Sequence, residues 1–79
     1  MKNELGVYQT TDFLICTVLF YFDHELNNVD KSNLSRCVFN IEKKDGTENI
    51  LEKLHKGLLL VEPKRFQAIQ KEIKSRLYN

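Results

Sequence analysis

An apolar run from Phe13 to Phe22, interrupted only by Thr17, constrains the fold of this 79-residue chain more than any other feature. Most of its residue types favour strands. Its length, together with the preceding Thr10-Thr11-Asp12, which can cap a helix, favours a helix over residues 12–22. A helix that is apolar on nearly every side must be buried on several faces. We therefore expect a largely buried first helix, covered either by the rest of the domain or by a neighbouring subunit.

Residues 26–42 carry the pattern of a β-hairpin. The second half of this segment alternates between two faces, and the inner face carries Cys37, Phe39 and Ile41. Turn-forming residues separate the two halves and also follow the second one. The alternation predicts two half-buried antiparallel strands.

Two amphipathic helices are expected after the hairpin. The helix at 47–57 has Thr47 as its predicted cap and Gly57 as its predicted stop. The helix at 63–77 begins with a proline, which suits a first turn because its missing N–H costs nothing there. Between them, residues 58–61 are apolar and extended in character, which predicts either a third strand or a buried connector.

These elements predict one small α+β domain over residues 1–79, in the order helix, β-hairpin, helix, helix, with residues 1–9 as a lead-in. A chain of this size buries a single modest core. Two cysteines, Cys16 and Cys37, are too few for the framework of a small secreted protein, and the start of the chain carries no signal-peptide pattern. The apolar run is far too short to cross a bilayer. We therefore expect a cytoplasmic protein without a membrane anchor.

Catalytic and cofactor signatures are lacking in the sequence. The cysteines and histidines are widely spaced, without the pairs that metal sites use, so the cysteines are interpreted as buried structural residues and the histidines as surface residues. The thiol of Cys37 lies on the inner strand face, where it behaves as a small hydrophobe. The isolated glycines form no phosphate-binding loop. We expect no enzyme activity, no metal, no cofactor and no small-molecule substrate.

The apolar content is larger than a domain of this size can enclose, which predicts a binding module that acts through protein association. Symmetric dimers are the commonest way to bury such a surplus. The residues that we expect to form the association surface are Phe20, Phe22 and Leu59.

An alternative function is sequence-nonspecific binding of nucleic acid. Residues 1–30 carry one basic and five acidic residues, a net charge of −4, whereas residues 31–79 carry eleven basic and six acidic residues, a net charge of +5. A basic C-terminal half could neutralise phosphates, and Tyr78 is the aromatic residue that we expect to be exposed for stacking. The candidate phosphate contacts are Lys64, Arg65, Lys71 and Lys74.

Three short motifs occur in a recognisable order along the chain. They are Tyr-x-Thr-x-Asp from Tyr8 before the apolar helix, Arg-x-x-Phe from Arg36, and Pro-x-x-Phe from Pro63 at the start of the last helix. In this order the chain resembles, over residues 7–78, a family of small bacterial and phage proteins that is catalogued as a domain of unknown function. The family commonly has small residues and a glycine near the end of the first helix, where this chain has Phe20-Tyr21-Phe22-Asp23-His24. The resemblance supports the predicted fold and implies no substrate or catalytic residue.

Overall fold

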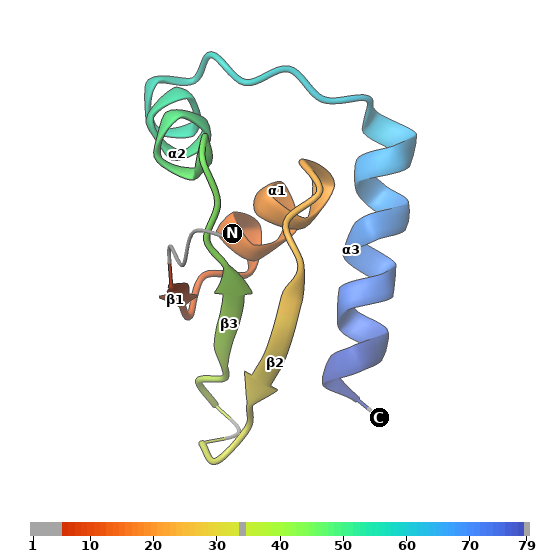
Figure 1. The fold of residues 1–79 in the computed structure, drawn as a ribbon. Coiled ribbons are helices and arrows are strands. Elements are labelled where there is room, and N and C mark those ends of the chain that lie inside the picture. Colours follow the sequence, from red (N-terminus) through yellow and green to blue (C-terminus); the bar gives the residue numbers. More distant parts are fainter. Residues whose placement is uncertain (1–5, 34, 79) are drawn as a thin grey trace.

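A computed structural model describes residues 6–33 and 35–78 of the chain, and it confirms a small α+β domain (Figure 1). Within these residues the fold has three helices and one antiparallel sheet of three strands, in the spatial order β1-β3-β2. The elements are β1 (Val7–Thr10), α1 (Phe13–Tyr21), β2 (Leu26–Asp30), β3 (Val38–Glu42), α2 (Thr47–Lys56) and α3 (Pro63–Leu77).

The first strand, β1, overlaps the segment 1–9 that the sequence predicted to be a lead-in, and it extends one residue beyond it, to Thr10. β1 pairs with β3 in antiparallel register, with Val7 opposite Glu42 and Thr10 opposite Phe39. Residues 1–5 of the predicted lead-in lie outside the described residues. The strand escapes sequence analysis because it has only four residues, and because its hydrogen-bonding partner comes from a distant part of the chain.

The predicted hairpin is present as β2 and β3, with a register irregularity between Leu26 and Asn28. The outer face of the sheet carries a ladder of amide side chains across all three strands. The Nε2 of Gln9 donates to the Oδ1 of Asn40 at 2.6 Å, and the Nδ2 of Asn40 donates to the Oδ1 of Asn28 at 2.6 Å. The ladder keeps this face polar, so the apolar core lies on the opposite face.

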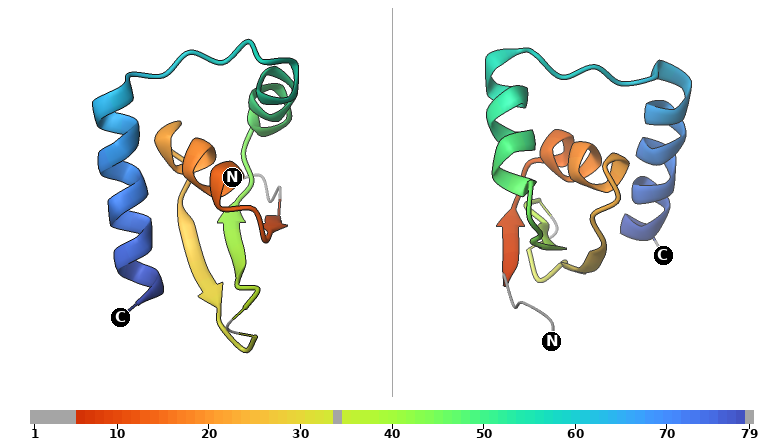
Figure 2. Two further views of the ribbon diagram at one scale, coloured as in Figure 1. Left: turned by 180° about the vertical axis from the view of Figure 1, so that it is seen from behind. Right: turned by 45° about the horizontal axis from the view of Figure 1, so that its top comes forward.

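The apolar run forms a helix, as predicted, and α1 lies between α2 and α3 (Figures 1 and 2). Its N-cap is Asp12, whose carboxylate accepts the backbone N–H groups of Leu14 and Ile15. Because α1 is covered by the sheet on one side and by α3 on another, most of its side chains are buried, although Leu14 remains 47% exposed. The buried core consists of Cys16, Leu19, Leu26, Phe39, Ile41 and Ile73.

The prediction that Thr47 caps α2 is wrong. Gly46, with φ of 92°, is the N-cap, and the side chain of Thr47 is fully buried. The Thr47 hydroxyl accepts the Lys44 N–H at 2.9 Å and lies 2.7 Å from the Nε2 of His24. The interpretation of His24 as a surface residue is also wrong, since it is 2% exposed and its Nδ1 lies 3.0 Å from the carbonyl oxygen of Phe22. This network joins the end of α1 to the start of α2.

The last helix begins at Pro63, and the Glu62 carboxylate caps it by accepting the Arg65 N–H at 2.7 Å. Ile73 is the residue of α3 that is fully buried. The chain between α2 and α3 is neither a strand nor a buried connector. It runs as an extended arch over residues 58–62, from α2 across to α3 (Figure 2). The segment is extended because the two helices stand on opposite sides of α1 and the arch must bridge them.

Candidate functional site

The arch, residues 58–62, carries the most exposed leucines of the described chain. Leu60 is 90% exposed and Leu58 is 63% exposed, while Leu59 and Val61 are half-buried. In extended backbone, alternate side chains point to opposite sides. The two exposed leucines therefore share the outer side of the arch, and their neighbours face the protein.

The backbone of the arch is anchored near its two ends. At one end the Leu58 N–H donates to the Lys53 carbonyl at 2.9 Å, and at the other the Glu62 N–H donates to the Tyr21 hydroxyl at 2.9 Å. Among the described residues, the backbone groups of residues 59–61 make no hydrogen bond. The middle of the arch thus presents unpaired donors and acceptors together with exposed apolar side chains.

A shallow hollow of about 390 Å³ lies where the arch meets α3. It is lined by Val61, Pro63 and Phe66, with polar side chains of the first turns of α3 at its rim. The ring of Phe66 packs at 5.9 Å from that of Tyr21, which fixes the floor of the hollow against α1. Apolar surface therefore continues from the arch onto the start of the last helix.

The predicted association residues are all less exposed than the outer leucines of the arch. Phe20 is half-buried against the core, with the Arg76 guanidinium 5.2 Å from its ring centre. Phe22 is half-buried with its ring edge on Tyr21 at 4.9 Å. Leu59 is on the inner side of the arch. Residues 58–61 are all apolar, so the sequence carries no alternation that could have shown which of the leucines face solvent.

The four predicted phosphate contacts lie on two flanks of α3. Lys64, Lys71 and Lys74 are all exposed, and their spacing of seven and three residues places them along one flank. Among the described residues none of these three lysines pairs with a carboxylate. Arg65 lies on the other flank, where its guanidinium stacks 4.6 Å from the centre of the Tyr21 ring. The expected exposure of Tyr78 is confirmed, at 83%.

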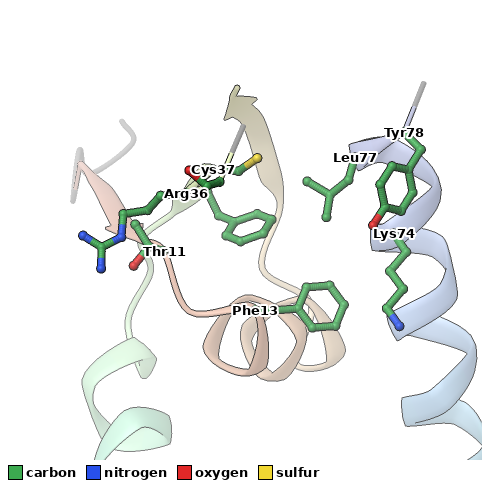
Figure 3. A pocket seen from close by; sticks show the side chains of 9 residues that line it. Thr11, Phe13, Arg36, Cys37, Lys74, Leu77 and Tyr78 are labelled. Atoms are coloured by element: carbon green, nitrogen blue, oxygen red, sulfur yellow. The ribbon is translucent and has the colours of Figure 1, made fainter. Parts of the chain in front are cut away.

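A second hollow, of about 460 Å³, lies at the other end of α3 (Figure 3). One wall comes from α3, with Lys74, Leu77 and Tyr78. The opposite wall comes from the segment before β3, with Arg36 and Cys37. We call this hollow the C-terminal pocket.

The floor of the C-terminal pocket is aromatic. The rings of Phe13 and Phe39 lie 6.3 Å apart, and the Lys74 ammonium is 5.8 Å from the centre of the Phe13 ring. Cys37 is half-buried here, so its thiol lines an open pocket and does not lie in the core with Ile41. Sequence analysis missed this pocket, because its walls come from three separated segments.

The two cysteines are both free thiols in different surroundings. Cys16 is fully buried, and burial raises the pKa of its thiol to about 12, while the charge of Arg76 opposes the shift. In the described part of the chain, no three His, Cys, Asp or Glu side chains gather in a way that could hold a metal ion. None of the described helices is both long and apolar enough to cross a bilayer.

Comparisons with protein-family models, with curated protein sequences and with solved structures find no match to this chain. The resemblance to the family of small bacterial and phage proteins therefore stays a prediction.

Proposed function

We propose that this protein is a non-catalytic binding module that acts through protein association at the arch. The observation that carries the proposal is the 90% exposure of Leu60 on a segment whose central backbone groups make no hydrogen bond among the described residues. Burying one leucine side chain contributes about 1.5–3 kcal/mol. A partner that covers an exposed leucine of the arch would therefore gain this free energy on binding. The apolar hollow beside Pro63 extends the same surface.

A second copy of the chain is the partner that fits the arch most simply. In a two-fold contact the same segment lies against itself, so each unpaired N–H meets an equivalent C=O. Addition of one extended segment to another uses main-chain hydrogen bonds for affinity and alternate side chains for specificity. Leu58 and Leu60, on one side of the arch, would be covered together. The net charge of +1 per chain opposes such pairing only weakly.

The test is sedimentation equilibrium from low micromolar to millimolar protein, at low and at high salt. The wild type should dimerise with little dependence on salt, and Leu60→Asp should shift the protein to monomer. Leu14→Asp is the matched control, because Leu14 is also an exposed leucine but lies on α1. A wild type that stays monomeric at every concentration would contradict self-association, and equal loss of dimer in both variants would contradict the arch as its interface.

Binding of a phosphate backbone is the second candidate function. It is supported by the flank of α3 that carries Lys64, Lys71 and Lys74 without carboxylate partners among the described residues, and by exposed Tyr78 at the end of that helix. Each phosphate contact should add about 0.7 to the slope of log affinity against log salt for a single strand.

Fluorescence anisotropy with a labelled single-stranded oligonucleotide tests this candidate. Lys71→Gln should weaken binding and lower the salt slope, whereas Lys56→Gln, whose lysine pairs with Glu52 on α2, should change neither. Absence of binding at low salt would eliminate the candidate without bearing on the arch.

We also propose that the protein is cytoplasmic. Two free thiols, Cys16 and Cys37, are consistent with the reducing cytoplasm that we expect for this protein.

A further inference from the structure

The C-terminal pocket combines positive charge with an apolar floor. None of the described residues that line it is acidic. Lys74 stands on the wall formed by α3, and Arg36 lies on the opposite side with its guanidinium pointing away from α3 (Figure 3). Among the described residues, neither cation lies within ion-pair distance of a carboxylate. This contrasts with Arg76 on the same helix, which pairs with Glu72 at 3.6 Å. Within residues 6–33 and 35–78, no carboxylate therefore neutralises the charge of Lys74.

The Lys74 ammonium lies over the aromatic floor of the pocket. It is 5.8 Å from the centre of the Phe13 ring, a cation–π distance. The hydroxyl of Tyr78 is a further donor on the same helix, whereas Thr11 lies on the opposite side, near Arg36 (Figure 3). An anionic group near Lys74 would find a cation and the hydroxyl donor of Tyr78, and a flat body attached to it would rest on Phe13 and Phe39. A volume of about 460 Å³ is within the range of small-molecule sites.

We propose that the C-terminal pocket binds a small organic anion with an aromatic body and a carboxylate or phosphate head. Lys74 pairs with the head, and the two phenylalanine rings hold the body. The site is independent of the arch, because the arch joins the first turn of α3 and the pocket uses its last turn. It goes beyond the sequence-based expectation, which included no small-molecule ligand.

Cys37 provides a reporter in the wild-type protein. Its thiol lines the pocket, whereas Cys16 is fully buried with a pKa of about 12 and serves as an unreactive internal reference. Alkylation of Cys37 by iodoacetamide is followed by mass spectrometry in the presence of phenyl phosphate, benzoate, benzyl alcohol or inorganic phosphate. Phenyl phosphate or benzoate should slow the alkylation, and the one that does so at lower concentration identifies the preferred head.

The two remaining probes decide whether both halves of the ligand matter. Protection by benzyl alcohol at the same concentrations would show a purely apolar hollow and overturn the proposal. Equal protection by inorganic phosphate would show a bare cationic patch and overturn it as well. Backbone amide shifts in the NMR spectrum provide a second measurement, and no shift around Cys37 or Lys74 with either aromatic anion would also overturn it.

A pair of variants tests the role assigned to the helix wall. Lys74→Gln should weaken binding of the aromatic anion about tenfold, the size expected for loss of a charged hydrogen-bond partner. Lys64→Gln removes the same charge at the other end of α3 and should leave the affinity unchanged. Equal effects of the two variants would overturn the assignment. Leu60→Asp should still bind the anion, so failure of the arch proposal leaves this result unaffected.

Discussion

Two apolar segments of this protein differ in how far the fold buries them. The helix α1 buries Cys16, Val18 and Leu19 almost completely, whereas the arch leaves Leu58 and Leu60 largely in solvent. The difference arises because other elements of the fold cover α1 but do not cover the arch. α1 satisfies its own backbone and is enclosed by the sheet, α2 and α3, while the arch bridges two helices and has nothing outside it among the described residues. Apolar composition therefore indicates which segments tend to be buried. The topology decides which of them are buried by other parts of the same chain.

The largest effect expected from this comparison is on stability. Leu19→Ala should lower the free energy of unfolding by about 3 kcal/mol, because the leucine is fully buried and its removal leaves a cavity. Leu60→Ala should change it by less than about 0.5 kcal/mol. Urea denaturation of dilute protein measures both values. Comparable losses in the two variants would mean that the arch is covered as well as α1.

We also expect a loss of stability when the connection between α1 and α2, the helix that leads to the arch, is changed. Thr47→Val keeps the shape of the side chain but leaves the buried Nε2 of His24 and the Lys44 N–H without a partner. We expect a loss of about 1–3 kcal/mol. Thr47→Ser, which retains the hydroxyl, is the control and should lose clearly less. If valine is tolerated as well as serine, the network does not hold the two helices together.

A smaller effect is expected where the two apolar segments touch. Tyr21→Phe removes the hydroxyl that accepts the Glu62 N–H at 2.9 Å, while the ring can still pack against Phe66. The loss of stability should be about 1 kcal/mol. Hydrogen exchange measured by NMR should show faster exchange at Glu62 and no change at Leu58, which is anchored to Lys53. Unchanged exchange at Glu62 would show that this hydrogen bond does not hold the arch.

An effect that is absent at neutral pH concerns the thiol of Cys16. Burial raises the pKa of Cys16 from 9.0 to about 12, so the folded state favours the neutral thiol. The stability linked to this thiol is fully present below pH 9 and is lost as the pH rises towards about 12. Thermal melts across this interval should therefore fall more steeply for the wild type than for Cys16→Ala. Parallel curves would show that the thiol is not held in a dry environment.

Sequence analysis predicted the elements whose signals are local. The helix after Asp12, the alternation through Phe39 and Ile41, and the helix from Pro63 each carry their own pattern, and the structure has all three. What it missed depends on partners distant in sequence. β1 is a strand only because it pairs with β3, and His24 is buried only because Thr47 meets it.

The candidate sites likewise contain some residues that a local sequence pattern can place and others that depend on partners distant in the sequence. The lysines of the last helix could be placed on one flank from spacing alone, whereas Arg65 could not be assigned to the ring of Tyr21. The C-terminal pocket needs residues from the start of α1, the segment before β3 and the end of α3. No local pattern brings such segments together, so the site could be found only in three dimensions.

The position of Ile73 in the core has a consequence for the synthesis of this protein. α1 emerges from the ribosome before Phe39 and Ile41, and Ile73 follows later still. Until then the nascent chain carries an uncovered apolar helix, which is the kind of surface that chaperones bind. A stalled chain that stops within the arch would thus leave one side of this apolar helix exposed, although all three of the described strands had already been made.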